Sequence, residues 1–109
     1  MELTVDFEAG IIEQIRTDQA FTNALIDEVD EVLAEGENEP AQGMLRVLVS
    51  GTIGFDALAK TLSMSSQSLQ ELLSQEMSPD TASLKTITTA LKLALRVAAS
   101  SSSRLLRRR

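Results

Sequence analysis

The chain has 109 residues, 3% aromatic residues and a formal net charge of −6. This length suits one domain with its own hydrophobic core. Cysteine and histidine are both absent, which excludes disulfides, thiolate metal sites and catalysis by either side chain. The sequence has no glycine-rich phosphate-binding motif. We therefore expect a protein that is not an enzyme and has no cofactor or metal. Because Leu, Ile, Val, Ala and Met supply most of the apolar residues, which suits helix-on-helix packing, we also expect an all-α fold.

The N-terminal residues 1–10 are acidic and lack the long apolar run of a secretory signal. No stretch approaches the roughly 18 apolar residues that a membrane-spanning helix needs. We expect a cytoplasmic protein with no membrane partner.

The charge is distributed unevenly along the chain. Residues 1–40 hold 12 acidic residues and one arginine, a net charge of −11, whereas residues 41–109 hold four acidic and nine basic residues, a net charge of +5. A nucleic-acid-binding protein would place the basic part against phosphate and turn the acidic part elsewhere. The alternative is that the acidic residues simply form a solvated surface.

The first 36 residues predict two amphipathic helices. Asp18 is a suitable N-cap for the second helix, and Gly36 is a suitable stop. The apolar stripes of the two helices are Phe7, Ile11, Ile12 and Ile15, and then Phe21, Leu25, Val29, Val32 and Leu33. The acidic residues lie on the other face of the second helix. After a connection over residues 36–40, a third helix is expected from Ala41 to Val49.

The last predicted helix begins after Asp80, its expected N-cap, and runs from Thr81 to about Ala99. Leu93 and Val97 lie off its main apolar stripe. This extra apolar surface indicates either a dimer contact or packing in a small hydrophobic cluster beside the main core. The serine- and arginine-rich residues 100–109 predict a disordered basic tail. Such a tail can contact phosphate, or be a solubilising or vector-derived end.

The most specific pattern lies in residues 53–73, where two short helices are joined by a tight turn. A small residue, Ala59, suits the close helix crossing of a helix-turn-helix, and Ser65 suits the N-cap of the second helix. The residues expected to point inward are Phe55, Leu58, Ala59, Leu62, Met64, Leu69, Leu72 and Leu73. The residues left on the outward side are Ser66, Gln67, Gln70 and Glu71. In a helix-turn-helix this side faces the major groove of DNA.

The alternative is an ordinary pair of packed helices, since any small helical protein contains helix, turn and helix. The small residue, the inward methionine and the capping serine at fixed offsets favour the helix-turn-helix.

The chain resembles the small Xre-type, lambda-repressor-like helix-turn-helix antitoxins that are encoded beside RelE/HigB-like toxins. The resemblance covers about residues 5–92. The matching stretches are D-Q-A-F-T-N-A-L (18–25), G-M-L-R (43–46), T-I-G-F-D-A-L-A (52–59), S-L-Q-E-L-L-S (68–74), P-D-T-A-S-L (79–84) and I-T-T-A-L (87–91). It implies a lambda-repressor-like helix-turn-helix bundle with an N-terminal helical extension. The expected parts are an acidic helical arm (1–36), a DNA-binding domain (37–99) and the basic tail (100–109).

The resemblance also implies which residues contact DNA. The base-contacting residues would be Ser66, Gln67, Gln70 and Glu71, and the phosphate-contacting residues would be Lys60, Thr81, Ser83 and Lys85, with Arg104–Arg109 as further cations. The chain departs from the family at several of these positions. Basic residues are common where it has Gln67 and Glu71, glycine is usual at Ser63, and threonine is typical at Asp80. Serine tolerates a left-handed backbone less well than glycine, so we expect the turn to be either slightly different or slightly strained.

Two functions are consistent with these residues. The first is an antitoxin and transcriptional autorepressor that reads operator DNA as a homodimer and neutralises a basic RelE/HigB-like toxin through its acidic arm. The second is a helical protein–protein interaction module that has lost DNA binding, which the acidic residues of the motif favour.

Overall fold

The computed structural model describes the backbone of residues 5–74 and 76–107 and the side chains of residues 8–74 and 76–96. All regular structure in this part of the chain is helical, which confirms the predicted all-α class. The helices are α1 (Val5–Thr17), α2 (Gln19–Ala34), α3 (Asn38–Gly51), α4 (Gly54–Thr61), α5 (Ser66–Leu72) and α6 (Thr81–Arg107). None of the described helices is long and apolar enough to cross a membrane.

Side chains at the predicted positions cap three of the helices: Asp18 caps α2, Ser65 caps α5 and Asp80 caps α6. The Asp18 carboxylate accepts a hydrogen bond from the backbone N–H of Phe21 at 3.0 Å, at the start of α2. At the start of α6, the Asp80 carboxylate accepts one from the N–H of Ser83 at 2.9 Å. Each cap satisfies an N–H group that has no partner within the helix.

α2 ends at the predicted glycine. Gly36 has a φ of +79°, and the N–H groups of Gly36 and Glu37 donate back to the carbonyls of Leu33 and Val32 at 3.0 and 2.9 Å. This pattern satisfies the last carbonyls of a helix and needs a left-handed residue, which glycine supplies without a steric penalty.

α3 begins earlier and ends later than predicted. It runs from Asn38 to Gly51 rather than from Ala41 to Val49. Pro40 suggested a connection, but it lies in the first turn of the helix, where a backbone N–H would have no partner in any case. The predicted break between α3 and α4 is present but shorter, because only residues 52 and 53 separate the two helices.

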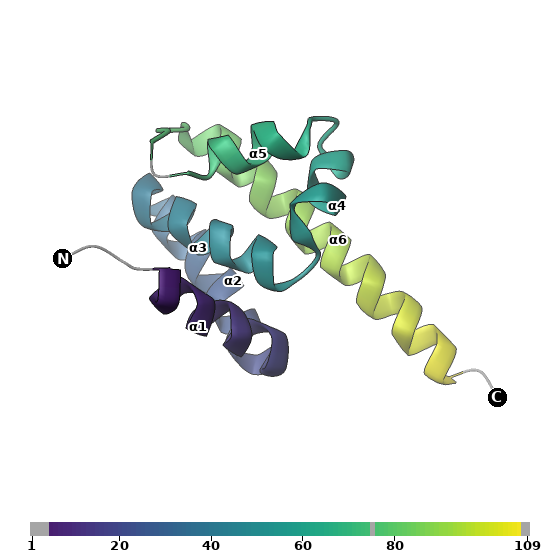
Figure 1. The fold of residues 1–109 in the computed structure, drawn as a ribbon. Coiled ribbons are helices and arrows are strands. Elements are labelled where there is room, and N and C mark those ends of the chain that lie inside the picture. Colours follow the sequence, from purple (N-terminus) through teal and green to yellow (C-terminus); the bar gives the residue numbers. More distant parts are fainter. Residues whose placement is uncertain (1–4, 75, 108–109) are drawn as a thin grey trace.

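One hydrophobic core receives residues from all six helices. Figure 1 shows α1 and α2 lying against α3, with α6 crossing behind α3 and α4. Ile15, Val29 and Leu33 are buried in the same core as Leu48 and Leu91. Residues 5–36, the described part of the predicted acidic N-terminal arm, contribute side chains to this core, and α2 contacts both α3 and α6.

α6 continues to Arg107, past the predicted end near Ala99. Residues 100–107, predicted to be a disordered tail, are thus helical in the structure, and residues 108–109 lie outside the described part. The chain has no glycine or proline after Pro79, and leucine and arginine are strong helix formers while serine is only moderately unfavourable. The end of α6 projects beyond the other helices (Figure 1) and contributes to principal dimensions of 51 × 29 × 27 Å.

Candidate nucleic-acid interface

The helix pair α4–α5 has the predicted inward face. Leu58, Ala59, Leu69 and Leu73 are buried. The other four predicted inward residues pack against this core as partly buried side chains, and they are Phe55, Leu62, Met64 and Leu72. Because α5 has only seven residues, it is too short to be stable alone and depends on these contacts.

The turn between the two helices is left-handed at Ser63, which has a φ of +59°. The N–H of Met64 donates to the carbonyl of Ala59 at 2.9 Å, and the N–H of Ser63 donates to that of Lys60 at 3.1 Å. These bonds form the helix-terminating pattern in which glycine is the preferred left-handed residue. The expected strain is therefore present, since a side chain in this conformation costs about 1–2 kcal/mol. Ser65 then caps α5 by accepting from the N–H of Ser68 at 3.0 Å.

Three of the four predicted base-contacting residues are exposed on α5, namely Gln67, Gln70 and Glu71, whereas Ser66 is half-buried. Gln67 donates to the Glu71 carboxylate at 3.3 Å, and Gln70 donates to the Ser66 hydroxyl at 3.2 Å. These bonds run along the helix surface, so a base edge can replace them without disturbing the core. The structure brings these four side chains together on one face.

The C-terminal end of α5 is held by Gln42, a residue that the sequence interpretation missed. The buried Gln42 amide donates to the carbonyls of Leu72, Ser74 and Met77 at 2.9, 2.6 and 3.1 Å. The last carbonyls of a helix have no partner within it. Gln42 therefore connects the middle of the molecule to the end of α5 and to the loop that follows.

Arg46, one helical turn further along α3, also holds α5. Its guanidinium donates to the carbonyl of Leu73 at 2.8 Å and forms an ion pair with Glu8 of α1 at 2.7 Å. The positive charge lies at the negative end of α5, where it is favourable. The only sequence signal for the roles of Gln42 and Arg46 is their i, i+4 spacing on a helix whose other neighbours are apolar.

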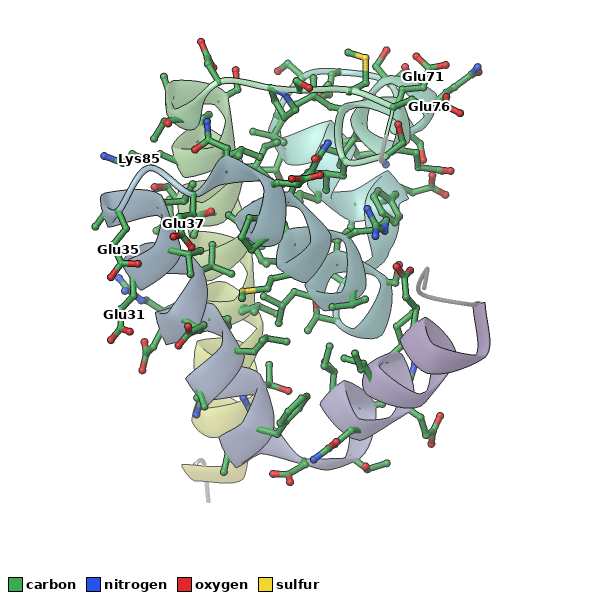
Figure 2. The ribbon with its side chains drawn as sticks, turned by 90° about the vertical axis from the view of Figure 1, so that its left-hand side faces the viewer. Glu31, Glu35, Glu37, Glu71, Glu76 and Lys85 are labelled. Atoms are coloured by element: carbon green, nitrogen blue, oxygen red, sulfur yellow. The ribbon has the colours of Figure 1, made fainter. Side chains whose placement is uncertain are left out.

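The predicted phosphate-contacting residues lie on α4 and α6. Thr81 donates its hydroxyl hydrogen to Asn38 at 2.8 Å, and the N–H of Ser83 is already bonded to Asp80. Figure 2 shows Lys85 on the side where Glu35 and Glu37 project, away from Glu71. Lys60 is exposed at the end of α4, next to the turn. The side chains of Arg104–Arg109 lie outside the described residues.

Acidic side chains lie on α5, in the loop that follows it and at the start of α6. Glu71 and Glu76 project from the same side of the molecule (Figure 2), and Asp80 is exposed at the start of α6. Hydrogen bonds from the backbone N–H and hydroxyl of Ser83 lower the pKa of Asp80. Asp80 therefore carries its negative charge at neutral pH.

No family model, curated protein or solved structure matches this chain.

Proposed function

We propose that this protein is a DNA-binding antitoxin that represses its own operon, with α5 as the recognition helix. The proposal is supported chiefly by the α4–α5 geometry, in which a buried Ala59, a left-handed turn and a capped helix leave four polar residues outward. The second helix of such a unit lies in the major groove, with its N-terminal residues at the base edges. Gln67 and Gln70 have the donor–acceptor pair that recognises adenine, and Glu71 can accept from cytosine.

The acidic residues support a cationic protein partner, which we propose to be a RelE/HigB-like toxin. Glu31, Glu35 and Glu37 project together from the end of α2 and the turn after it (Figure 2). Carboxylates of this kind would cover the cations that a ribonuclease needs for RNA. Electrostatic attraction would speed association, and salt would weaken it. A toxin affinity that is independent of ionic strength would contradict this mechanism.

The decisive experiment measures fluorescence anisotropy on the native promoter fragment and on a scrambled fragment, at two salt concentrations. Replacing Gln67 and Gln70 together by alanine should cost roughly 1–3 kcal/mol per lost base contact on the promoter fragment alone. Gln14→Ala is the matched control, because Gln14 is exposed on α1, away from the motif. Equal affinity of the wild type and the double variant for the promoter would contradict the proposal.

The second candidate function is a helical interaction module without DNA binding. Negative charge favours this function, because Glu71, Glu76 and Asp80 would repel the phosphates of bound DNA. The same anisotropy experiment separates the two functions. Weak binding that is equal on both fragments would support the interaction module, and specific binding that weakens with salt would support the repressor.

A further inference from the structure

A groove of about 960 Å³ crosses the outer surface of α3 between α1, α2 and the loop that precedes α6. Its lining includes the half-buried apolar side chains of Ile11, Leu25 and Met44. Met77, at the loop side, is 45% exposed. The groove therefore offers apolar surface that no other part of the described chain covers.

Gly43 lies in the lining of this groove, in the interior of α3. A β-carbon at this position would have as its nearest neighbour the Nη2 of Arg46 at 3.9 Å, an ordinary contact distance. Packing therefore does not require glycine here, and alanine would favour the helix. What the missing side chain provides is access, since another chain can approach the backbone of α3 closely.

The rim of the groove is negatively charged. Glu39 and Asp80 are exposed at its edge. Arg46 is the cation in the lining, and it is already paired with Glu8. A complementary occupant therefore has apolar side chains for the groove, flanked by cations for the rim.

Residues 104–109 of this sequence have that pattern. They read Arg-Leu-Leu-Arg-Arg-Arg, an apolar pair flanked by arginines with no acidic residue. α6 begins next to the groove and has 27 residues, so it carries this segment about 40 Å away at 1.5 Å per residue. The segment cannot reach its own groove while α6 is helical, but it can reach the groove of a second copy.

We infer that the α3 groove binds the segment Arg104–Arg109 of a second copy, so that two chains exchange their C-terminal ends. In its sequence, this segment has an apolar Leu-Leu pair that matches the apolar lining of the groove and arginines whose charge is complementary to Glu39 and Asp80. This inference goes beyond the proposed function and does not depend on DNA binding.

Sedimentation equilibrium of the full-length chain, without DNA, tests the inference. Gly43→Leu fills the groove and Leu105→Asp removes the apolar anchor. Each variant should raise the dissociation constant of the dimer about tenfold or more, which is equivalent to about 1.4 kcal/mol. Gly43→Leu should not lower the melting temperature at low protein concentration, because leucine is the better helix former. A reduced melting temperature with unchanged association would overturn the inference.

A charge exchange makes the test specific. Glu39→Arg and Arg107→Glu should each weaken association, and the double variant should recover it. Leu93→Asp is the matched control on α6, since Leu93 is 50% exposed and outside the groove. Loss of the dimer in Leu93→Asp with wild-type association in both groove variants would overturn the inference, as would a protein that is monomeric at all concentrations. Either result leaves the anisotropy test of DNA binding unaffected.

Discussion

Ser63 is the one non-glycine residue with a positive φ in the described chain. It lies where the direction of the backbone changes between α4 and α5, and its exposed side chain has room around it. The buried leucines on both sides and the two turn hydrogen bonds impose this conformation. A small amount of backbone strain is therefore stored beside the candidate recognition helix.

Replacing Ser63 by glycine should stabilise the protein by about 0.5–1 kcal/mol, because the relief of left-handed strain exceeds the added entropy of the unfolded chain. Urea unfolding followed by circular dichroism measures this change. Ser65→Gly is the control in the same turn, and it should destabilise the protein by a few tenths of a kcal/mol through loss of the cap. A lower stability of the Ser63 variant would show that the serine side chain has a stabilising role.

Asp80 should make the stability depend on pH in the acidic range. Its pKa is lowered from 3.8 by the Ser83 hydrogen bonds, so the stabilisation is complete above 3.8 and is lost as the pH falls through the lower folded-state value. Asp80→Asn keeps an acceptor but does not titrate, so its melting temperature should change less with pH in this range than that of the wild type. Parallel curves for the two proteins would contradict this assignment.

At the scale of one element, α5 depends on two sets of contacts. Leucines fix the face that it turns inward, and α3 fixes its C-terminal end through Gln42 and Arg46. The position of the exposed glutamines is therefore determined by residues that never reach the outer surface of α5.

Gln42→Leu keeps the volume and removes the amide that bonds three carbonyls. It should lower the free energy of unfolding by about 1–3 kcal/mol, because carbonyls near the protein interior lose their partner. Chemical denaturation measures this loss, and Gln14→Leu on the surface of α1 should change stability little. An unchanged free energy of unfolding in Gln42→Leu would mean that water replaces the amide without cost.

The helical class, the caps at Asp18, Ser65 and Asp80 and the inward leucines of α5 could be predicted because each depends on residues within one or two helical turns. The roles of Gln42 and Arg46 could not, since their partners lie 27 to 38 residues away along the chain. The outward face of α5 followed from the same local periodicity. The surroundings of Lys85 depend on the packing of α2 against α6, which periodicity does not specify.

At the scale of the whole molecule, Gly51 sets how closely α1 approaches α3. A β-carbon there would lie 2.8 Å from the Cγ2 of Ile15 and 3.2 Å from the carbonyl oxygen of Ile12. The absence of a side chain thus permits the two helices to cross in close contact. This crossing incorporates the acidic N-terminal helices into the body of the protein.

Gly51→Ala should therefore destabilise the protein by about 1–3 kcal/mol, since the added methyl group forces α1 to shift. Gly43→Ala is the matched control, because the same change in the same helix meets only the Nη2 of Arg46 at 3.9 Å, an ordinary contact distance, and should stabilise the monomer by about 0.5–1 kcal/mol. Thermal unfolding at a low protein concentration compares the two. Stabilisation in both variants would show that α1 does not pack this closely in solution.

Arg46 bonds to α1 and α5 at the same time. Local unfolding of α1 breaks the ion pair between Arg46 and Glu8. The Arg46 guanidinium can then also leave the Leu73 carbonyl. The first helix and the last turn of α5 are thus expected to open as one cooperative unit on the timescale of amide hydrogen exchange, although they are far apart in sequence. A ligand that immobilises α1 would then slow the fraying of α5, and so alter the entropy that this helix loses when it binds.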